Sequence, residues 1–312
     1  MNKMIKLNIN KKQIERLRRF STVRIDEPMR NYTTFSTGGP ADVFVCPYTK
    51  DSVKEIVSIA WNESIPYTII GGGSNILVGN KGIRGILIRL CEDFEIKGEI
   101  RIEDDDTIYV DSIKKKEAFM LFCLNHGYMG MEFMTGIPGC IGGGIIMNAG
   151  TVYGSFVDIL KKILYINNSG NIDTMVVTDE MARYRRLDID NGLIVLGGFF
   201  KLFKTDNISG VKDKINKIQE ERRLKHPLDY PSAGSVFKNP EGYSAWKLID
   251  EAGLKGKRIG GAVVSDLHTN FIINVDNATS SDVLNLINYI KERVLSRFNI
   301  LLKTEIEILG EF

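Results

Sequence analysis

The sequence predicts an α+β protein with more than one domain. A length of 312 residues exceeds one typical core and suggests about two domains. Segments with helical and with strand-like periodicity are interleaved along the chain, without the regular alternation of βαβ units. Hydrophobic residues make up 43% of the chain, which is enough to fill large buried cores.

In the first half of the chain, apolar residues at helical spacing predict helices, and short apolar runs flanked by Gly or Pro predict strands. An alternating segment around an acidic turn predicts a hairpin. In order, we expect a helix over residues 10–20, a strand over 41–46, a helix over 50–64, strands over 66–70 and 85–90, a hairpin over 94–112, and a helix from 115 that closes on Gly127.

The second half continues the same interleaving. A strongly charged helix stops before Pro227 and is expected to link into a C-terminal unit. The last helix has Ser280 and Ser281 as its expected N-caps. The expected elements are strands within residues 163–177 and 193–203, helices over 210–226, 244–254 and 280–298, and strands over 270–275 and 304–309.

Charge and cysteine content exclude several classes of protein. The formal net charge of +2 gives no reason to expect a nucleic-acid partner. Four widely spaced cysteines, Cys46, Cys91, Cys123 and Cys140, indicate buried free thiols, with neither a metal site nor a disulfide framework. The N-terminus has no apolar signal segment, and no apolar run reaches the roughly 20 residues that span a bilayer. We therefore expect a cytoplasmic protein without a membrane partner.

The segment "YTIIGGGSNILV" places three consecutive glycines between two apolar runs. Backbone N–H groups without side chains in the way can form a concave anion site, so Gly71, Gly72, Gly73, Ser74 and Asn75 are candidates for a pyrophosphate cradle. The structural alternative is a tight turn between strands. Neither the Rossmann fingerprint nor the P-loop pattern is present, so any phosphate binds a different kind of loop.

A second glycine-dense segment favours the binding interpretation over the turn. Gly136, Gly139, Gly142, Gly143 and Gly144 crowd nine residues, with Pro138 stiffening the turn. We interpret both segments as loops next to apolar strands. Two such loops suit a long ligand lying between them, such as a dinucleotide.

Several motifs occur together in the order of one known family. "NYTTFSTGGPAD", "IIGGGSNILV", "GMEFMTGIPGCIGGGIIMNAG", "YPSAGSVFKNP", "LIDEAGLKGKRIGGAVVSDLHTNFIIN" and "LLKTEIEILGE" resemble the UDP-N-acetylenolpyruvoylglucosamine reductases of bacterial peptidoglycan synthesis. The resemblance runs from about Asn31 to the C-terminus. The short stretch from Tyr153 to Arg185 is similar to the shorter, type II branch of that family.

The resemblance implies FAD, held without a covalent bond, in a two-part region of the vanillyl-alcohol-oxidase (PCMH) type. A C-terminal α+β domain would close over the substrate. The implied boundaries are an N-terminal helix over residues 1–20, FAD-binding subdomains over 21–95 and 96–206, and a substrate domain over 207–312. The implied cofactor contacts are Tyr32, Gly71, Gly72, Gly73, Ser74, Asn75, Gly136, Pro138, Gly139, Gly142, Gly143 and Asn148.

The implied reaction moves hydride from NADPH through FAD to the enolpyruvyl ether of UDP-N-acetylglucosamine, and a proton completes the product. By resemblance, Ser235 is the proton donor, Glu305 is the acidic partner at the substrate carboxylate, and Arg185 pairs with that carboxylate or assists Glu305. From their sequence positions alone, these residues could equally be a turn serine, a solvent-facing strand residue and part of a surface basic cluster. Lys238, Asn239 and Arg222 are the implied contacts to the UDP-sugar, and we expect a monomer.

Three positions depart from the family pattern: Ser36, Asp111 and Leu187. Each is expected near flavin or substrate, and Asp111 either lies close to the flavin or points to water. The departures leave open an oxidoreductase of the same fold with another substrate, or a flavin-binding protein without turnover. The retained Ser235 and Glu305 favour the reductase, since a mere binder has no use for a proton donor.

Overall fold

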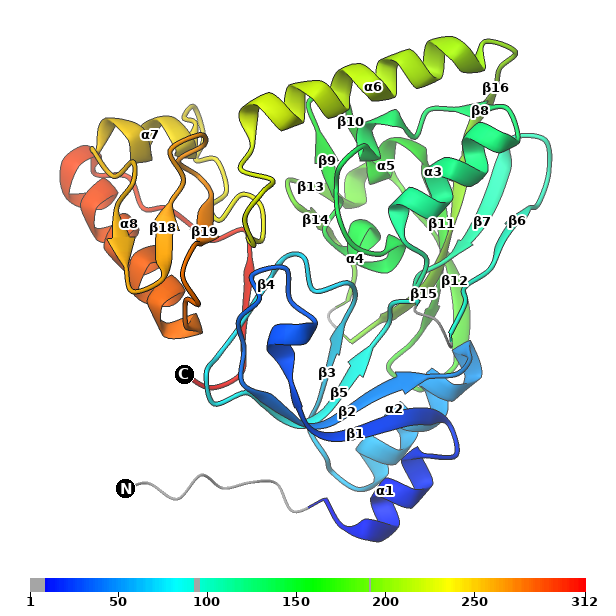
Figure 1. The fold of residues 1–312 in the computed structure, drawn as a ribbon. Coiled ribbons are helices and arrows are strands. Elements are labelled where there is room, and N and C mark those ends of the chain that lie inside the picture. The colour runs from blue at the N-terminus through cyan, green and yellow to red at the C-terminus, as the bar shows by residue number, and fades with distance from the viewer. Residues whose placement is uncertain (1–8, 93–95, 191) are drawn as a thin grey trace.

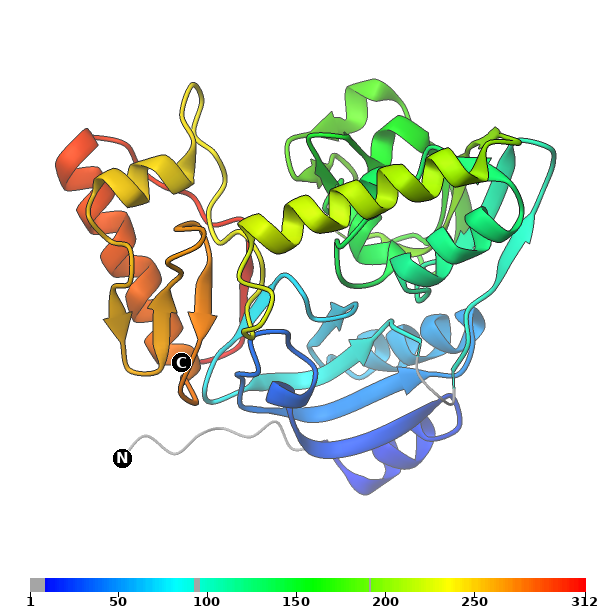
Figure 2. The same cartoon turned by 45° about the horizontal axis from the view of Figure 1, so that its top comes forward.

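The computed structural model describes residues 9–92, 96–190 and 192–312, and within them the chain forms three α+β units (Figure 1). The predicted N-terminal helix is confirmed over Lys11–Leu17, while the part of that prediction on residues 1–8 lies outside the described residues. The third unit lies beside the other two (Figure 2), and one long helix runs across the top of the molecule toward it (Figure 1).

The first unit is a four-stranded sheet in the order β1-β2-β5-β3, with α1 and α2 packed into one core with it. Strands β1 and β2 are antiparallel, whereas β5 is parallel to both β2 and β3. The Thr49 side chain accepts the Ser52 N–H and so begins α2, whose apolar face the sheet buries. The elements are α1 (Lys11–Leu17), β1 (Ser21–Pro28), η1 (Met29–Asn31), β2 (Pro40–Pro47), α2 (Lys50–Asn62), β3 (Tyr67–Ile70), β4 (Ile76–Val78) and β5 (Ile83–Arg89).

The second unit is a five-stranded antiparallel sheet in the order β12-β11-β15-β7-β6. The predicted acidic hairpin is confirmed as β6 and β7, apart from residues 94 and 95, which lie outside the described residues. The elements are β6 (Ile100–Ile102), β7 (Thr107–Asp111), α3 (Lys116–Asn125), β8 (Tyr128–Met129), η2 (Glu132–Met134), α4 (Ile141–Ile146), β9 (Gly150–Thr151), β10 (Gly154–Ser155), α5 (Phe156–Ile159), β11 (Leu160–Ile166), β12 (Ile172–Val176), η3 (Asp179–Met181), β13 (Ala182–Arg183), β14 (Arg186–Leu187), β15 (Ile194–Lys201) and β16 (Phe203–Lys204).

The long helix α6 (Ile208–Lys225) connects the second and third units (Figure 1). Its buried face is narrow, and Val211 and Ile215 belong to the core of the second unit. The helix therefore packs on the second unit, although the sequence groups it with the C-terminal one. Its last turn reaches the region where the three units meet.

The third unit packs α7 and α8 on the three-stranded antiparallel sheet β17-β18-β19. The expected N-caps Ser280 and Ser281 are wrong by one and two positions, because the N-cap is Thr279, whose side chain accepts the Asp282 N–H in a capping box. The elements are α7 (Ala245–Glu251), β17 (Arg258–Ile259), β18 (Ala262–Val264), β19 (Ile272–Asn274), α8 (Ser280–Phe298) and β20 (Glu307–Leu309).

The final strand returns to the first unit. Strand β20 pairs in parallel with β4, and Glu307 N–H donates to the Asn75 carbonyl at 2.9 Å. Just before β20, the Glu305 N–H donates to the Val236 carbonyl at 2.8 Å. One stretch of backbone thereby joins the first glycine segment to the third unit.

Candidate active site

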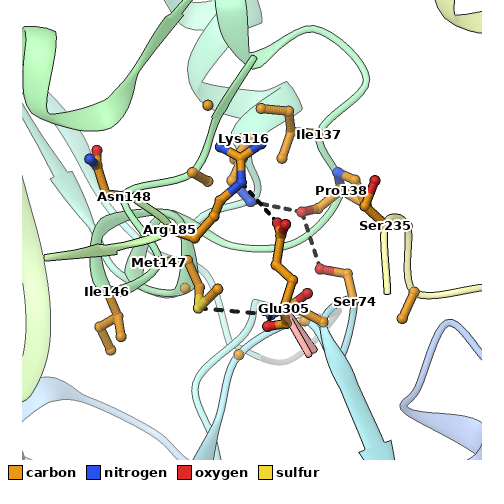
Figure 3. Close-up of a pocket in the computed structure, with 18 of the residues that line it drawn as sticks. Ser74, Lys116, Ile137, Pro138, Ile146, Met147, Asn148, Arg185, Ser235 and Glu305 are labelled. Atoms are coloured by element: carbon orange, nitrogen blue, oxygen red, sulfur yellow. Dashed lines mark hydrogen bonds and ion pairs between the residues drawn. The ribbon is translucent and has the colours of Figure 1, made fainter. Parts of the chain in front are cut away.

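The three units enclose a cavity of about 1250 Å³. Pockets for a single small molecule are usually about 300–1,000 Å³, so this one has room for a dinucleotide together with part of a second ligand. Both glycine segments line it, and so do the β13–β14 hairpin, the end of α6 and the third unit. Figure 3 shows the side chains that converge there.

The first glycine segment lies in the cavity wall as predicted. Gly71, Gly72, Gly73, Ser74 and Asn75 all line the cavity between β3 and β4. A Cβ on Gly72 would lie 2.8 Å from the Gly139 Cα, and one on Gly73 would overlap the Tyr32 carbonyl oxygen. Gly73 also has a φ of +70°. Removing the side chains thus lets this loop touch backbone on both flanks while its inner face stays open.

The second glycine segment is only partly the loop that we expected: Gly136 and Gly139 lie in a loop with positive φ, but the rest of the segment is a short helix. Gly142, Gly143 and Gly144 lie within α4. A Cβ on Gly142 would lie 2.9 Å from Ser112 Cβ, and one on Gly144 would overlap the Phe156 ring, whereas Gly143 faces open space. Close packing of α4 on its neighbours therefore requires two of these glycines, despite their poor helix propensity.

Pro138, Gly142, Gly143 and Asn148 line the cavity as expected of cofactor contacts, but three other predicted contacts lie behind the wall. Gly139 packs against the Ser74 hydroxyl, and Gly136 packs against Arg222. The Tyr32 ring lies 4.4 Å from that of Phe44 (between centroids), and its carbonyl supports Gly73. Their places in the structure give them a supporting role.

Arg185 and Glu305 meet in the cavity. Arg185 lies in the two-residue turn between β13 and β14 with a φ of +58°, and its Nε is 2.9 Å from Glu305 Oε1. Burial raises the pKa of Glu305, and the Arg185 guanidinium opposes that shift. The left-handed conformation of Arg185 thus places its guanidinium beside the Glu305 carboxyl group of the C-terminal segment.

Ser235 faces the same cavity (Figure 3). It follows Gly234, which has a φ of +75°, and its backbone pairs with Phe271 of the third unit. The Glu305 N–H donates to the carbonyl of the next residue, Val236, so the two predicted catalytic side chains come from hydrogen-bonded neighbouring segments. Within the described ranges, the Ser235 hydroxyl has no hydrogen-bond partner, which disfavours the turn-capping alternative.

The expected UDP-sugar contacts occupy different places. Arg222 lines the main cavity, and its Nη2 donates to the Gly136 carbonyl at 2.8 Å. Asn239 also lines it, while its Oδ1 accepts the Ala245 N–H that opens α7. Lys238 instead lines a smaller adjoining cavity of about 310 Å³, which shares Arg185 and Glu305 with the main one.

The three departures from the family pattern lie away from the main cavity, contrary to expectation. Ser36 is an exposed residue with a φ of +57°. Leu187 is buried in the core of the second unit and touches only the smaller cavity. Asp111 is buried, and its carboxylate accepts hydrogen bonds from Lys50 Nζ at 2.8 Å, Tyr109 OH at 2.7 Å and the Glu99 N–H at 2.7 Å. It therefore points neither to water nor into the cavity.

Sequence reasoning missed Lys116, which lines the cavity with only 3% of its surface exposed. Nothing in the run of three lysines from Lys114 to Lys116 distinguishes the last one. The four cysteines are buried free thiols, as predicted, and Cys140 lines the cavity. Cys91 hydrogen-bonds to Cys140, which lowers the pKa of the Cys91 thiol to about 7.

Two histidines, His226 and His268, lie together at the cavity wall. His268 lines the cavity, and its Nδ1 accepts the Asn270 N–H at 3.3 Å. The His226 ring stacks on Phe271 and lies 5.5 Å from the His268 ring, and burial lowers the pKa of His226 to about 4. Within the described part of the chain, no group of three metal-ligating side chains forms, and no helix is long and apolar enough to cross a membrane.

A cavity of this size, walled by glycine backbone from two units and reached by polar groups of a third, is the arrangement of an FAD-dependent oxidoreductase. The family model described as "FAD binding domain" matches residues 41–175, and the model for the C-terminal domain of UDP-N-acetylenolpyruvoylglucosamine reductase matches residues 226–309. The chain belongs to the UDP-N-acetylenolpyruvoylglucosamine reductase family, as its similarity to whole members of that family shows. The predicted fold class and FAD cofactor are confirmed.

Two curated relatives and one solved structure illustrate that similarity. The UDP-N-acetylenolpyruvoylglucosamine reductase of Clostridium tetani is 40% identical over 290 residues, covering 93% of this chain and 92% of the relative. That of Alkaliphilus oremlandii is 42% identical over 293 residues, covering 93% and 94%. The crystal structure of the Thermus caldophilus enzyme superposes with a TM-score of 0.77 at 30% identity, covering 93% of this chain and 99% of that one.

Proposed function

We propose that this protein reduces the enolpyruvyl ether of UDP-N-acetylglucosamine to UDP-N-acetylmuramate with electrons from NADPH. The observation that carries the proposal is that Ser235, Glu305 and Arg185, which come from separate parts of the chain, line one cavity with the glycine segments. FAD, when bound, supplies the carrier chemistry that accepts hydride from NADPH and delivers it to the methylene carbon.

The residues present fit FAD. The first glycine segment offers backbone without side chains, and a Cβ on Gly72 or Gly73 would disrupt its contacts. Gly143 leaves open space on the facing wall. Ser74 and Asn75 would hold the pyrophosphate with the glycines, and Pro138 and Asn148 would contact the cofactor from the second unit.

Arg185 and Glu305 would stabilise the substrate carboxylate. Negative charge grows there once the methylene carbon has accepted hydride, and preorganised donors around that charge lower the barrier. The planar guanidinium suits a planar carboxylate. Glu305 already has a raised pKa, and an incoming carboxylate would raise it further, so that the protonated group donates a hydrogen bond.

Ser235 would deliver the proton to the neighbouring carbon. A hydroxyl is a weak acid, but the carbanion is a strong base, so the transfer runs downhill. The hydroxyl is not committed to a described protein partner and faces the cavity. Asn239 and Arg222 in the main cavity and Lys238 in the smaller one would contact the UDP-sugar.

An anaerobic assay tests the function. NADPH oxidation by the yellow, FAD-loaded protein is expected to proceed to completion only when the enolpyruvyl substrate is present. If a different substrate reduces the flavin and NADPH does not, the protein is another oxidoreductase of the same fold. If neither NADPH nor another substrate reduces the flavin, the chain is a flavin-binding protein without turnover.

The Ser235→Ala variant tests the proton donor. Flavin reduction by NADPH should stay near the wild-type rate, whereas substrate reduction should slow by about 10²- to 10⁴-fold, the usual contribution of a positioned acid. Stopped-flow absorbance separates the two half-reactions. Ser232→Ala, in the same loop but outside the cavity lining, is the matched control. Equal loss of both half-reactions would show that Ser235 is structural.

We also propose that the protein acts as a monomer in the cytoplasm, without nucleic-acid or membrane partners. One chain supplies every group assigned above, so a second copy is not required. Four free thiols suit a reducing compartment. Light scattering after size-exclusion chromatography measures the oligomeric state, and a dimer mass would contradict this part of the proposal.

A further inference from the structure

Lys116 carries a buried ammonium group that has no carboxylate partner among the residues that the structure describes. Only 3% of the residue is exposed, and within the described residues its Nζ makes one hydrogen bond, to the Pro138 carbonyl at 2.7 Å. Glu117 beside it is exposed. An ammonium removed from water is costly unless an opposite charge compensates it.

The helix that carries Lys116 adds to this cost. Lys116 is the first residue of α3, and the N-terminus of a helix has a partial positive charge that disfavours cations. Burial lowers the pKa of Lys116 to about 8, while the Cys140 and Cys91 thiols and Glu117 oppose that shift. The local structure therefore supplies no carboxylate that compensates the charge of this lysine.

The ammonium lies beside the first glycine segment. Ser74 Oγ donates to the same Pro138 carbonyl at 3.2 Å, so Lys116 and Ser74 share one acceptor (Figure 3). A Cβ placed on Gly139 would be 2.6 Å from Ser74 Oγ and 3.5 Å from Lys116 Nζ. Ser74 is the hydroxyl residue of the pyrophosphate cradle, which places a positive charge at the edge of that cradle.

The other cations of the main cavity are engaged elsewhere. Arg185 pairs with Glu305, and Arg222 donates to the Gly136 carbonyl. Arg183 pairs with Asp188 and Lys225 with Glu221. The glycine segment itself leads into strand β4, so no helix dipole supports it. Backbone N–H groups alone bring no net charge to balance a pyrophosphate.

We propose that Lys116 provides the positive charge that pairs with the pyrophosphate of FAD. The inference rests on the proposed function only through FAD, and it is independent of the substrate. It assigns the residue to cofactor binding, since the ammonium lies at the Ser74 end of the cavity wall. Such a pair would also relieve the cost of the buried ammonium.

The test compares ligands that contain or lack the pyrophosphate. In full-length Lys116→Met protein, the Kd for FAD should rise by about 10- to 100-fold, as expected for one charge-assisted hydrogen bond. The Kd for ADP should rise by a similar factor, and that for riboflavin should stay the same. Lys115→Met is the matched control, because the exposed neighbouring lysine carries the same charge.

Other outcomes overturn the inference. An unchanged Kd for FAD, or an equal rise for riboflavin, would remove Lys116 from the pyrophosphate site, and the latter would place it at the flavin ring. If Lys116→Met loses its circular dichroism, Lys116→Gln decides, since it can still donate to the Pro138 carbonyl but lacks the charge. Wild-type protein that binds no FAD would contradict the proposed function itself.

Discussion

Pairing of Lys116 with the pyrophosphate predicts that the affinity for FAD depends on pH. Its pKa in the cavity is about 8 because the ammonium is buried, compared with 10.5 for an ordinary lysine. A bound pyrophosphate would raise that pKa, because an opposite charge favours the protonated form. Binding of FAD must therefore take up a proton at any pH at which Lys116 is deprotonated in the free protein. The affinity is fully present below about pH 8 and falls as pH rises through that value.

The size of the effect follows from the position of the pKa. With a pKa of about 8, Lys116 is about nine-tenths protonated at pH 7 and about one-tenth protonated at pH 9. The Kd for FAD should then be about 10-fold higher at pH 9 than at pH 7, which is about 1.4 kcal/mol. Binding at pH 8 should take up about half a proton.

Fluorescence titration of the FAD-free chain measures the Kd at each pH, and calorimetry in buffers of different ionisation enthalpy counts the protons. The Cys91 and Cys140 thiols face the same ammonium, and the pKa of Cys91 is lowered to about 7, so Cys91→Ala must be titrated in parallel. Ionisation of FAD itself is common to every variant and cancels in the comparison.

The reasoning predicts a slope in the wild type and in Cys91→Ala, and no slope in Lys116→Met. A Lys116→Met protein that keeps the tenfold change would show that another group controls the affinity. Loss of the slope in Cys91→Ala would assign it to the thiol pair. A wild-type Kd that is level from pH 7 to pH 9 would mean that the ammonium never approaches the pyrophosphate.

Two further substitutions test the walls of the cavity. Gly73→Ala forces a Cβ onto the Tyr32 carbonyl at a φ of +70°, so it should lower the melting temperature and reduce the bound FAD at least 10-fold. Gly143→Ala, whose Cβ meets open space, should leave the melting temperature of FAD-free protein unchanged, and equal destabilisation by both would refute this argument. Asp111→Asn removes the charge partner of Lys50 and should cost about 1–3 kcal/mol of unfolding free energy while the Kd for FAD stays constant. A changed Kd for FAD would show that Asp111 belongs to the flavin site.

Periodicity predicted the elements whose packing agrees with their local propensity. The apolar stripe of α2 and the alternation of β6 and β7 needed no tertiary information. Helix α4 could not be predicted in this way, because glycine opposes helix formation and only the contacts of Gly142 and Gly144 make the helix favourable. Local propensity and tertiary packing disagree there, and packing decides.

Family motifs predicted the main residues of the candidate site, but only the three-dimensional fold shows which neighbours position them. The sequence alone left Arg185 in a cluster with Arg183 and Arg186, and only the left-handed turn separates it from them. No feature of the sequence distinguished Lys116 from its neighbours, because the three consecutive lysines differ only in burial. The position of Asp111 could not be predicted for the same reason, because its partners Lys50 and Glu99 lie far from it in the sequence.

The register of the C-terminal segment ties the Ser235 segment to the first glycine segment. Glu305 N–H bonds to the Val236 carbonyl and Glu307 N–H bonds to the Asn75 carbonyl, so one segment positions both neighbours. Glu305 and Ile306 lie in the bend just before β20, and they face different surroundings: Glu305 lines the cavity, whereas Ile306 is 2% exposed in the core of the third unit. A slip of one residue would turn the Glu305 carboxylate into that core and Ile306 toward the cavity, at a large cost in burial. The hydrophobic core of the third unit therefore fixes the position of Glu305 opposite Arg185.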